Sequence, residues 1–111
     1  EKNPAAAAQL FQIAASAGDV DGMLNYGYCL GTGTGVPRDL VAGSAWYRMA
    51  AARGNQTAAK NLRAVGQEIN AAQREQVDAL TARLDRLVES GGFDAAELPE
   101  IPELQPQPSS K

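Results

Sequence analysis

The sequence predicts an all-α fold, an α/α solenoid of short paired helices sealed by a C-terminal capping helix. Three observations lead to this prediction. Ala, Leu, Gly and Gln dominate a chain of 111 residues that is only 5% aromatic, a composition that favours helices packed closely through small side chains. The chain also repeats itself at a fixed interval, and every expected helix begins at a residue able to cap it.

The internal repeat has an interval of 36 residues. Ala14-Ala15 recurs as Ala50-Ala51. Further pairs at the same interval are Ala6 and Ala42, Leu10 and Trp46, Phe11 and Tyr47, Gly18 and Gly54, Asp19 and Asn55, Gly22 and Ala58, Asn25 and Asn61, and Tyr26 and Leu62. A period of about 20–50 residues indicates a repeat architecture in which each unit packs on the next.

Start and stop residues place the first four helices in order. They are expected near residues 4–17, 20–31, 40–53 and 56–67, with the N-caps Asn3, Asp19, Asp39 and Asn55. Pro4 supports the first start, because its missing N–H costs nothing at the first helical position. Gly18 and Gly54 can end the first and third helices. The glycines and proline of residues 31–37 break the chain after the second.

The fifth expected helix, near residues 70–90, is long and amphipathic. Asn70 with Gln73 forms a capping box, and Gly91-Gly92 stops the helix. Its apolar residues step by three or four and form one stripe: Val77, Leu80, Leu84, Leu87 and Val88. Its charged residues are expected to face solvent: Arg74, Glu75, Asp78, Asp85 and Arg86. Residues 91–111 are acidic and Pro-rich, and we expect a flexible tail there.

The residues from Gly18 to Asn61 form a recognisable series. In order they are Gly18-Asp19, Gly22, Asn25, Gly27, Gly33-Thr34-Gly35-Val36-Pro37, Asp39, Ala45-Trp46-Tyr47, Ala50-Ala51 and Gly54. This series resembles the Sel-one-like repeat (SLR) family, which is related to the tetratricopeptide (TPR) repeat. The resemblance implies a TPR-like superhelix.

The resemblance also implies a division of the chain. Residues 1–90 would be the repeat domain, with a half repeat at 1–17, a full repeat at about 18–53, a half repeat at 54–67 and the capping helix at about 70–90. We expect the first helix of the first repeat to be missing or to lie upstream of Glu1. Because the chain begins at Glu1 without Met, we also expect a signal peptide, a propeptide or a preceding domain to have been removed.

Helix packing and backbone geometry explain the residues of this series. Small residues are expected where two helices approach closely: Gly22, Gly27, Ala45 and Ala50. Trp46 and Tyr47 are expected to fill the core, with a ligand-stacking platform as the alternative. Gly33 and Gly35 permit backbone angles that a side chain would forbid, and Val36 is expected to hold the loop against the helices.

Composition argues against catalysis. The chain has no His, and its single Cys29 has no neighbours at metal-ligand spacing, so we predict no enzyme, no metal site and no cofactor. Cys29 is expected to be a core thiol. The glycines of residues 31–35 lack the Lys-Ser/Thr of a P-loop and follow a helix rather than a strand.

The charge and hydropathy of the chain argue against two further kinds of partner. A net charge of −3 without a basic block argues against nucleic-acid binding, and no apolar run is long enough for membrane insertion.

The predicted function is protein–protein interaction, as a scaffold or adaptor. In related helical repeats the first helix of each pair lines a concave surface, and Asp21, Asn25 and Tyr28 lie about one turn apart on the helix expected there. They are the candidate partner-binding residues, although Asn25 could instead hydrogen-bond within the repeat, as the matching Asn61 suggests. The alternative function is a structural C-terminal cap of a larger multidomain protein whose activity lies upstream.

The family resemblance implies a bacterial signalling or envelope assembly, with an extracytoplasmic site, periplasmic or secreted, favoured over the cytoplasm. An accessory to an enzyme of cell-wall or polysaccharide metabolism would require a catalytic domain upstream. Leu98, Ile101 and Leu104 recur between prolines, which suggests that the tail docks on a repeat surface in an extended form.

Overall fold

The computed structural model describes residues 3–93, which form five α-helices and no strand. The helices are α1 (Pro4–Ser16), α2 (Val20–Thr32), α3 (Leu40–Ala52), α4 (Gln56–Gly66) and α5 (Ala71–Glu89). Each bound lies within one residue of the expected one, so the all-α prediction is confirmed. The predicted tail lies, apart from its first three residues, outside the described part of the chain.

All five predicted N-caps are confirmed by their hydrogen bonds. The side chain of each cap accepts from the backbone N–H three residues on, at distances from 2.7 Å for Asp19 to 3.2 Å for Asn3. At α5 the Gln73 side chain also accepts from the Asn70 backbone N–H, at 2.9 Å, which completes the capping box. A cap of this kind contributes about 1 kcal/mol to stability. Five helix starts are therefore fixed by local chemistry.

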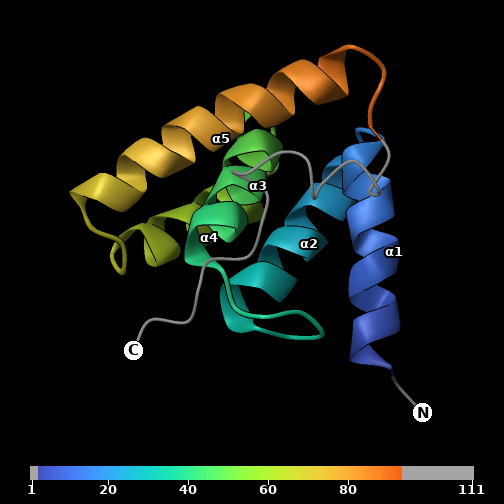
Figure 1. The fold of residues 1–111 in the computed structure, drawn as a ribbon, viewed down its shortest axis with the longest axis horizontal. Coiled ribbons are helices and arrows are strands. Elements are labelled where there is room, and N and C mark those ends of the chain that lie inside the picture. The colour runs from blue at the N-terminus through green and yellow to red at the C-terminus, as the bar shows by residue number, and fades with distance from the viewer. Residues whose placement is uncertain (1–2, 94–111) are drawn as a thin grey trace.

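Helices α1 to α4 pack one after another in chain order, as Figure 1 shows. α2 contacts α1, α3 and also α4, which is the arrangement of a helical solenoid. The expected small residues lie at these contacts. A Cβ on Gly22 would lie 2.8 Å from the Cβ of Ala14, and one on Gly27 would lie 2.8 Å from Cδ1 of Tyr47. Any larger side chain there would push the helices apart.

The core is centred on α3. Trp46 and Tyr47 are 2% and 3% exposed, which confirms them as core residues. The Trp46 ring meets Tyr26 of α2 edge to face, with 5.8 Å between the ring centroids. Val36 packs against this core from the loop after α2, and Gly33 and Gly35 have φ angles of 77° and 78°, so the loop predictions are confirmed.

α5 crosses over α3 from the α4 side toward the end of α1 (Figure 1). Its residues Val77, Leu80 and Leu84 are buried in the common core. At its far end the backbone N–H of Phe93 donates to the carbonyl of Ser16, at 3.1 Å. The fifth helix thereby links α3 to the first helix of the chain.

The charged side of α5 faces solvent as predicted, with Asp85 half-buried, but two of its acidic residues also form ion pairs with arginines of α3 and its C-cap. Asp78 pairs with Arg48 of α3, and Asp85 pairs with Arg53 at 3.0 Å. The reason is geometric. α5 lies along α3, so the acidic residues beside its apolar stripe meet the arginines at the margin of α3.

Candidate binding surface

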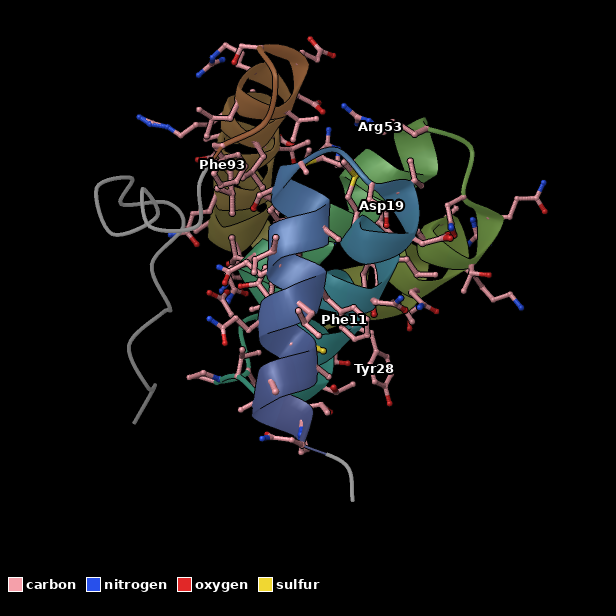
Figure 2. All side chains as sticks on the ribbon, turned by 90° about the vertical axis from the view of Figure 1, so that its right-hand side faces the viewer. Phe11, Asp19, Tyr28, Arg53 and Phe93 are labelled. Carbon is pink, nitrogen blue, oxygen red and sulfur yellow. The ribbon has the colours of Figure 1, made fainter. Side chains whose placement is uncertain are left out.

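The three candidate residues lie on α2, which positions them at intervals of four and three residues and so on one side of the helix. Tyr28 is 52% exposed, Asp21 is exposed and Asn25 is half-buried. In Figure 2 the Tyr28 ring projects from α2 away from the body of the molecule. α2 is fixed at its start by Asp19, whose carboxylate accepts from the backbone N–H of Gly22 at 2.7 Å.

Two tyrosines on α2 have opposite surroundings. Tyr26 is 8% exposed beneath Trp46, and burial, with a smaller effect from Asp39, raises its pKa to about 12. Its neighbour two positions on, Tyr28, points outward because a helix turns by about 200° over two residues. The buried phenol belongs to the core, whereas about half of the Tyr28 side chain is open to solvent.

The repeat itself supplies a comparison for Asn25. In the second unit, burial raises the pKa of Tyr47 while a hydrogen bond with Asn61 lowers it, so this tyrosine and asparagine are partners. In the first unit the corresponding pair is Phe11 and Asn25, and phenylalanine has no hydroxyl. Within the described residues the Asn25 side chain makes no hydrogen bond. The structural role that Asn61 suggested for Asn25 is therefore not found here.

Sequence reasoning did not single out an apolar patch on α1. Leu10 is 66% and Ile13 is 52% exposed, whereas the residues 36 positions later, Trp46 and Met49, are buried. The difference follows from the neighbours. Trp46 is covered by Tyr26 and Phe93, but within the described residues no helix occupies the corresponding place beside Leu10.

The surroundings of the Cys29 thiol do not favour its reaction as a nucleophile. The side chain is 3% exposed, which confirms it as a core thiol, and burial raises its pKa. A buried thiol with a raised pKa is a poor nucleophile, because the thiolate is the reactive form. Within the described residues, no three His, Cys, Asp or Glu side chains lie close enough together to hold a metal ion. None of the helices in residues 3–93 is both long and apolar enough to cross a bilayer.

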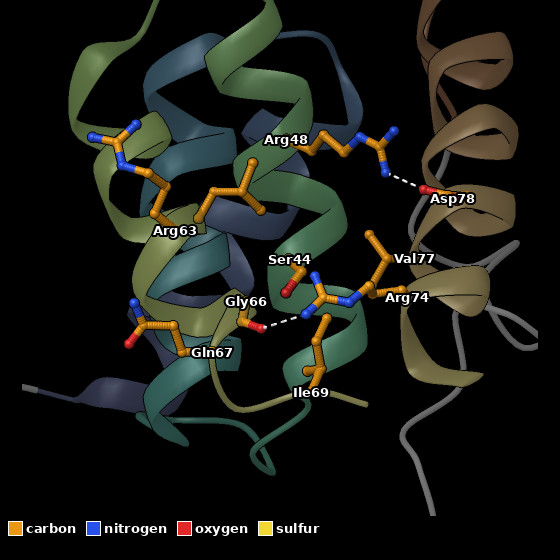
Figure 3. A pocket seen from close by; sticks show the side chains of 10 residues that line it. Ser44, Arg48, Arg63, Gly66, Gln67, Ile69, Arg74, Val77 and Asp78 are labelled. Carbon is orange, nitrogen blue, oxygen red and sulfur yellow. Dashed lines mark hydrogen bonds and ion pairs between the residues drawn. The ribbon is translucent and has the colours of Figure 1, made fainter. Parts of the chain in front are cut away.

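A pocket of about 560 Å³ opens between α3, α4 and α5 (Figure 3), and Tyr28 is not among the residues that line it. Its apolar lining consists of Leu62, Ile69 and Val77. Three arginines from three helices surround it: Arg48 of α3, Arg63 of α4 and Arg74 of α5. Among the described residues that line the pocket, Asp78 is the one that is acidic. Since these residues are far apart in the sequence, no local pattern could have predicted the pocket.

The first half of the chain matches a known protein family. A model of the Sel1 repeat matches residues 1–19 and 20–55, in register with the internal repeat and with the helix pair α2 and α3. No curated protein and no solved structure matches the chain. The family is a helical scaffold that generally mediates protein–protein interaction. Residues 1–55 belong to the Sel1 repeat family, and the chain is thus a Sel1 repeat helical protein.

Proposed function

We propose that the chain is a scaffold or adaptor module that binds a segment of a partner protein on the exposed side of α2. The contact residues are Asp21, Asn25 and Tyr28, on the helix that corresponds to the concave side of related repeats. The observation that supports this most strongly is Tyr28, an aromatic ring 52% exposed on an otherwise well-packed helix. Tyrosine is enriched among the residues that dominate binding energy at interfaces.

Each of the three side chains offers a different interaction. The Tyr28 ring can cover apolar atoms of the partner while its hydroxyl stays hydrogen-bonded to water or to the partner. Asn25 has an amide that is free of hydrogen bonds to the described residues, and it can pair with the backbone of a bound segment. Asp21 is exposed in the first turn of α2 and can pair with a basic residue. Tyr28 and Asp21 are seven residues apart on α2, so the proposed partner segment carries an apolar residue and a cation separated by about two helical turns or three extended residues.

The setting suggested by the resemblance, a bacterial signalling or envelope assembly, is part of this proposal. We do not propose a catalytic role for the module. In residues 3–93, Cys29 is buried and the carboxylates are scattered, so these groups form no reactive arrangement.

Site-specific crosslinking in the source cell tests the proposal. A photo-crosslinking amino acid is placed at position 28, or, as the matched control, at the exposed Gln76 of α5. We expect one protein to crosslink from position 28 and not from position 76. In a competition version, unlabelled chain should suppress the crosslink, and chain carrying Asn25→Ala and Tyr28→Ala should not. Equal crosslinking from both positions, or equal competition by both chains, would contradict the proposal.

A second function is favoured by the patch on α1. Leu10 and Ile13 are exposed where Trp46 and Met49 are covered, so a further helix could pack there, and α5 would then be the cap at the other end of a longer stack. In this alternative the module is a structural terminal cap. Leu10→Gln with Ile13→Gln should leave the stability of residues 1–111 unchanged within about 0.5 kcal/mol. The same pair of substitutions should destabilise any longer protein in which a helix covers the patch.

A further inference from the structure

We propose that the pocket between α3, α4 and α5 is a second binding site, which takes a glutamate or aspartate side chain of an extended peptide segment with apolar neighbours. The inference deepens the proposed function, because the occupant is a segment of a partner protein. It concerns other residues than Tyr28, so the two can fail separately.

The charge of the pocket favours an anion. Of its three arginines, Arg48 already pairs with Asp78. Arg74 donates to the backbone carbonyl of Gly66 over a long 3.4 Å, and Arg63 has no hydrogen bond or ion pair with any described residue. Among residues 3–93, the guanidinium groups of Arg63 and Arg74 thus have no carboxylate partner. Cations gathered around one cavity attract a negative group, and the planar guanidinium fits a carboxylate with two parallel hydrogen bonds.

A buried hydroxyl is the second, independent observation. Ser44 lies on the α3 wall of the pocket and is 1% exposed, and its Oγ has no hydrogen-bond partner within the described structure. Figure 3 shows this oxygen on the side of Ser44 that faces Arg74 and Gly66. Buried polar atoms are nearly always hydrogen-bonded, so an unpartnered one in a pocket wall indicates a place for a ligand atom. Because this oxygen has almost no accessible surface in the unbound chain, a carboxylate held by Arg74 accepts the Ser44 hydroxyl proton only when the side chains around Ser44 move aside.

The apolar lining and the volume of the pocket indicate which residues flank the acidic side chain in the bound segment. Val77 is buried, and Leu62 and Ile69 are half-buried, at the pocket lining. A volume of about 560 Å³ is within the range of ligand sites and large enough for an acidic side chain with one or two apolar neighbours. The three arginines are exposed at the rim, so a chain can enter and leave across the surface. Such an opening suits an extended peptide segment.

The test is a fluorescence-anisotropy titration of the full chain with a labelled eight-residue peptide of alternating glutamate and leucine. A peptide with glutamine in place of glutamate is the charge control. We expect saturable binding of the glutamate peptide, and at least about tenfold weaker binding of the glutamine peptide, because charge-assisted hydrogen bonds are roughly twice as strong as neutral ones.

Variants of the chain then locate the site. Ser44→Ala should weaken binding about fivefold while the thermal midpoint stays the same or rises, because the substitution removes an unsatisfied buried hydroxyl. Arg63→Gln should also weaken binding about fivefold, since one charged contact is lost. The matched control is Arg86→Gln, at an exposed arginine of α5 outside the pocket, which should bind as the wild type does.

Several results would overturn the inference. Equal binding of both peptides would show an apolar contact without carboxylate recognition. Full affinity of Ser44→Ala and Arg63→Gln would place the peptide elsewhere, and loss of binding in Asn25→Ala with Tyr28→Ala would place it on α2. Binding that appears only after Glu97, Glu100 and Glu103 are changed to Gln would make the chain's own acidic segment the occupant. By contrast, a failed crosslink at position 28 together with charge-dependent binding in the titration would support the pocket and reject the α2 surface.

Discussion

Gly27 is the point where the packing of α2 on α3 is most sensitive to one added carbon. A Cβ at this position would lie 2.8 Å from Cδ1 and 3.0 Å from Cε1 of Tyr47, and 3.3 Å from the carbonyl oxygen of Gly43. The Tyr47 ring is 3% exposed, so it cannot swing into solvent to make room. Gly27→Ala therefore forces the two helices apart or strains the ring.

The expected magnitude follows from two opposing effects. Alanine is a better helix former than glycine by about 1 kcal/mol. Overpacking a well-filled core costs about 1–3 kcal/mol, and contacts this short with a fixed ring belong in the upper half of that range. We expect the free energy of unfolding to fall by about 1–2 kcal/mol, which lowers the thermal midpoint by roughly 4–8 °C for a domain of this size.

Gly31 provides the matched control. It lies one turn later on the same helix, and its added Cβ would meet the Tyr47 ring at 3.9 Å, an ordinary contact distance. Gly31→Ala keeps the gain in helix propensity without the overlap, so it should stabilise the chain by about 0.5–1 kcal/mol. Urea and thermal unfolding followed by circular dichroism at 222 nm measure both. The reasoning would be refuted if Gly27→Ala raised the midpoint as much as Gly31→Ala does.

Three further predictions concern the core. The neutral Tyr26 phenol is favoured in the fold and its pKa is raised from 10.0 to about 12, so the free energy of unfolding should fall as pH rises between these values, by up to about 2–3 kcal/mol. Tyr26→Phe should remove most of that fall in urea titrations, and Tyr47, whose pKa is also raised, should account for the remainder. The buried Cys29 thiol should be alkylated by iodoacetamide, as read by mass spectrometry, no faster than the chain opens, and urea should accelerate the reaction. Phe93→Ala removes a ring stacked on Trp46, so it should cost about 1–2 kcal/mol and shift the Trp46 fluorescence to the red; an unchanged spectrum would contradict the stacking.

Helix bounds could be predicted from the sequence because they are determined locally. Asn70 and Gln73 form a capping box whatever α5 packs against, and Pro4 favours a first helical turn in any fold. The buried positions of α3 could be predicted for a different reason. The 36-residue repeat shows which positions of one unit correspond to those of the next, and the family pattern assigns those positions to the core.

The course of α5 could not be predicted in the same way. Its amphipathic stripe indicates that Leu80 and Leu84 are buried, but any apolar surface would satisfy that pattern. The ion pair between Arg53 and Asp85, and the stacking of Phe93 on Trp46, depend on the direction in which α5 crosses α3. The pocket depends on it too, because α5 supplies Arg74 and the helix beneath supplies Ser44.

The same dependence on neighbours explains why equivalent positions of the repeat differ in their surroundings. Leu10 and Trp46 occupy one repeat position, yet only Trp46 has Tyr26 and Phe93 against it. Asn25 and Asn61 occupy another, yet only Asn61 has a tyrosine hydroxyl to pair with. A repeat position that is satisfied in one unit and unsatisfied in the other is where a further chain can bind without disturbing the fold. On the proposed function, the first unit, with Asn25 and Leu10, is therefore one side from which the module contacts other proteins, while α5 covers the second unit except at the pocket that it borders.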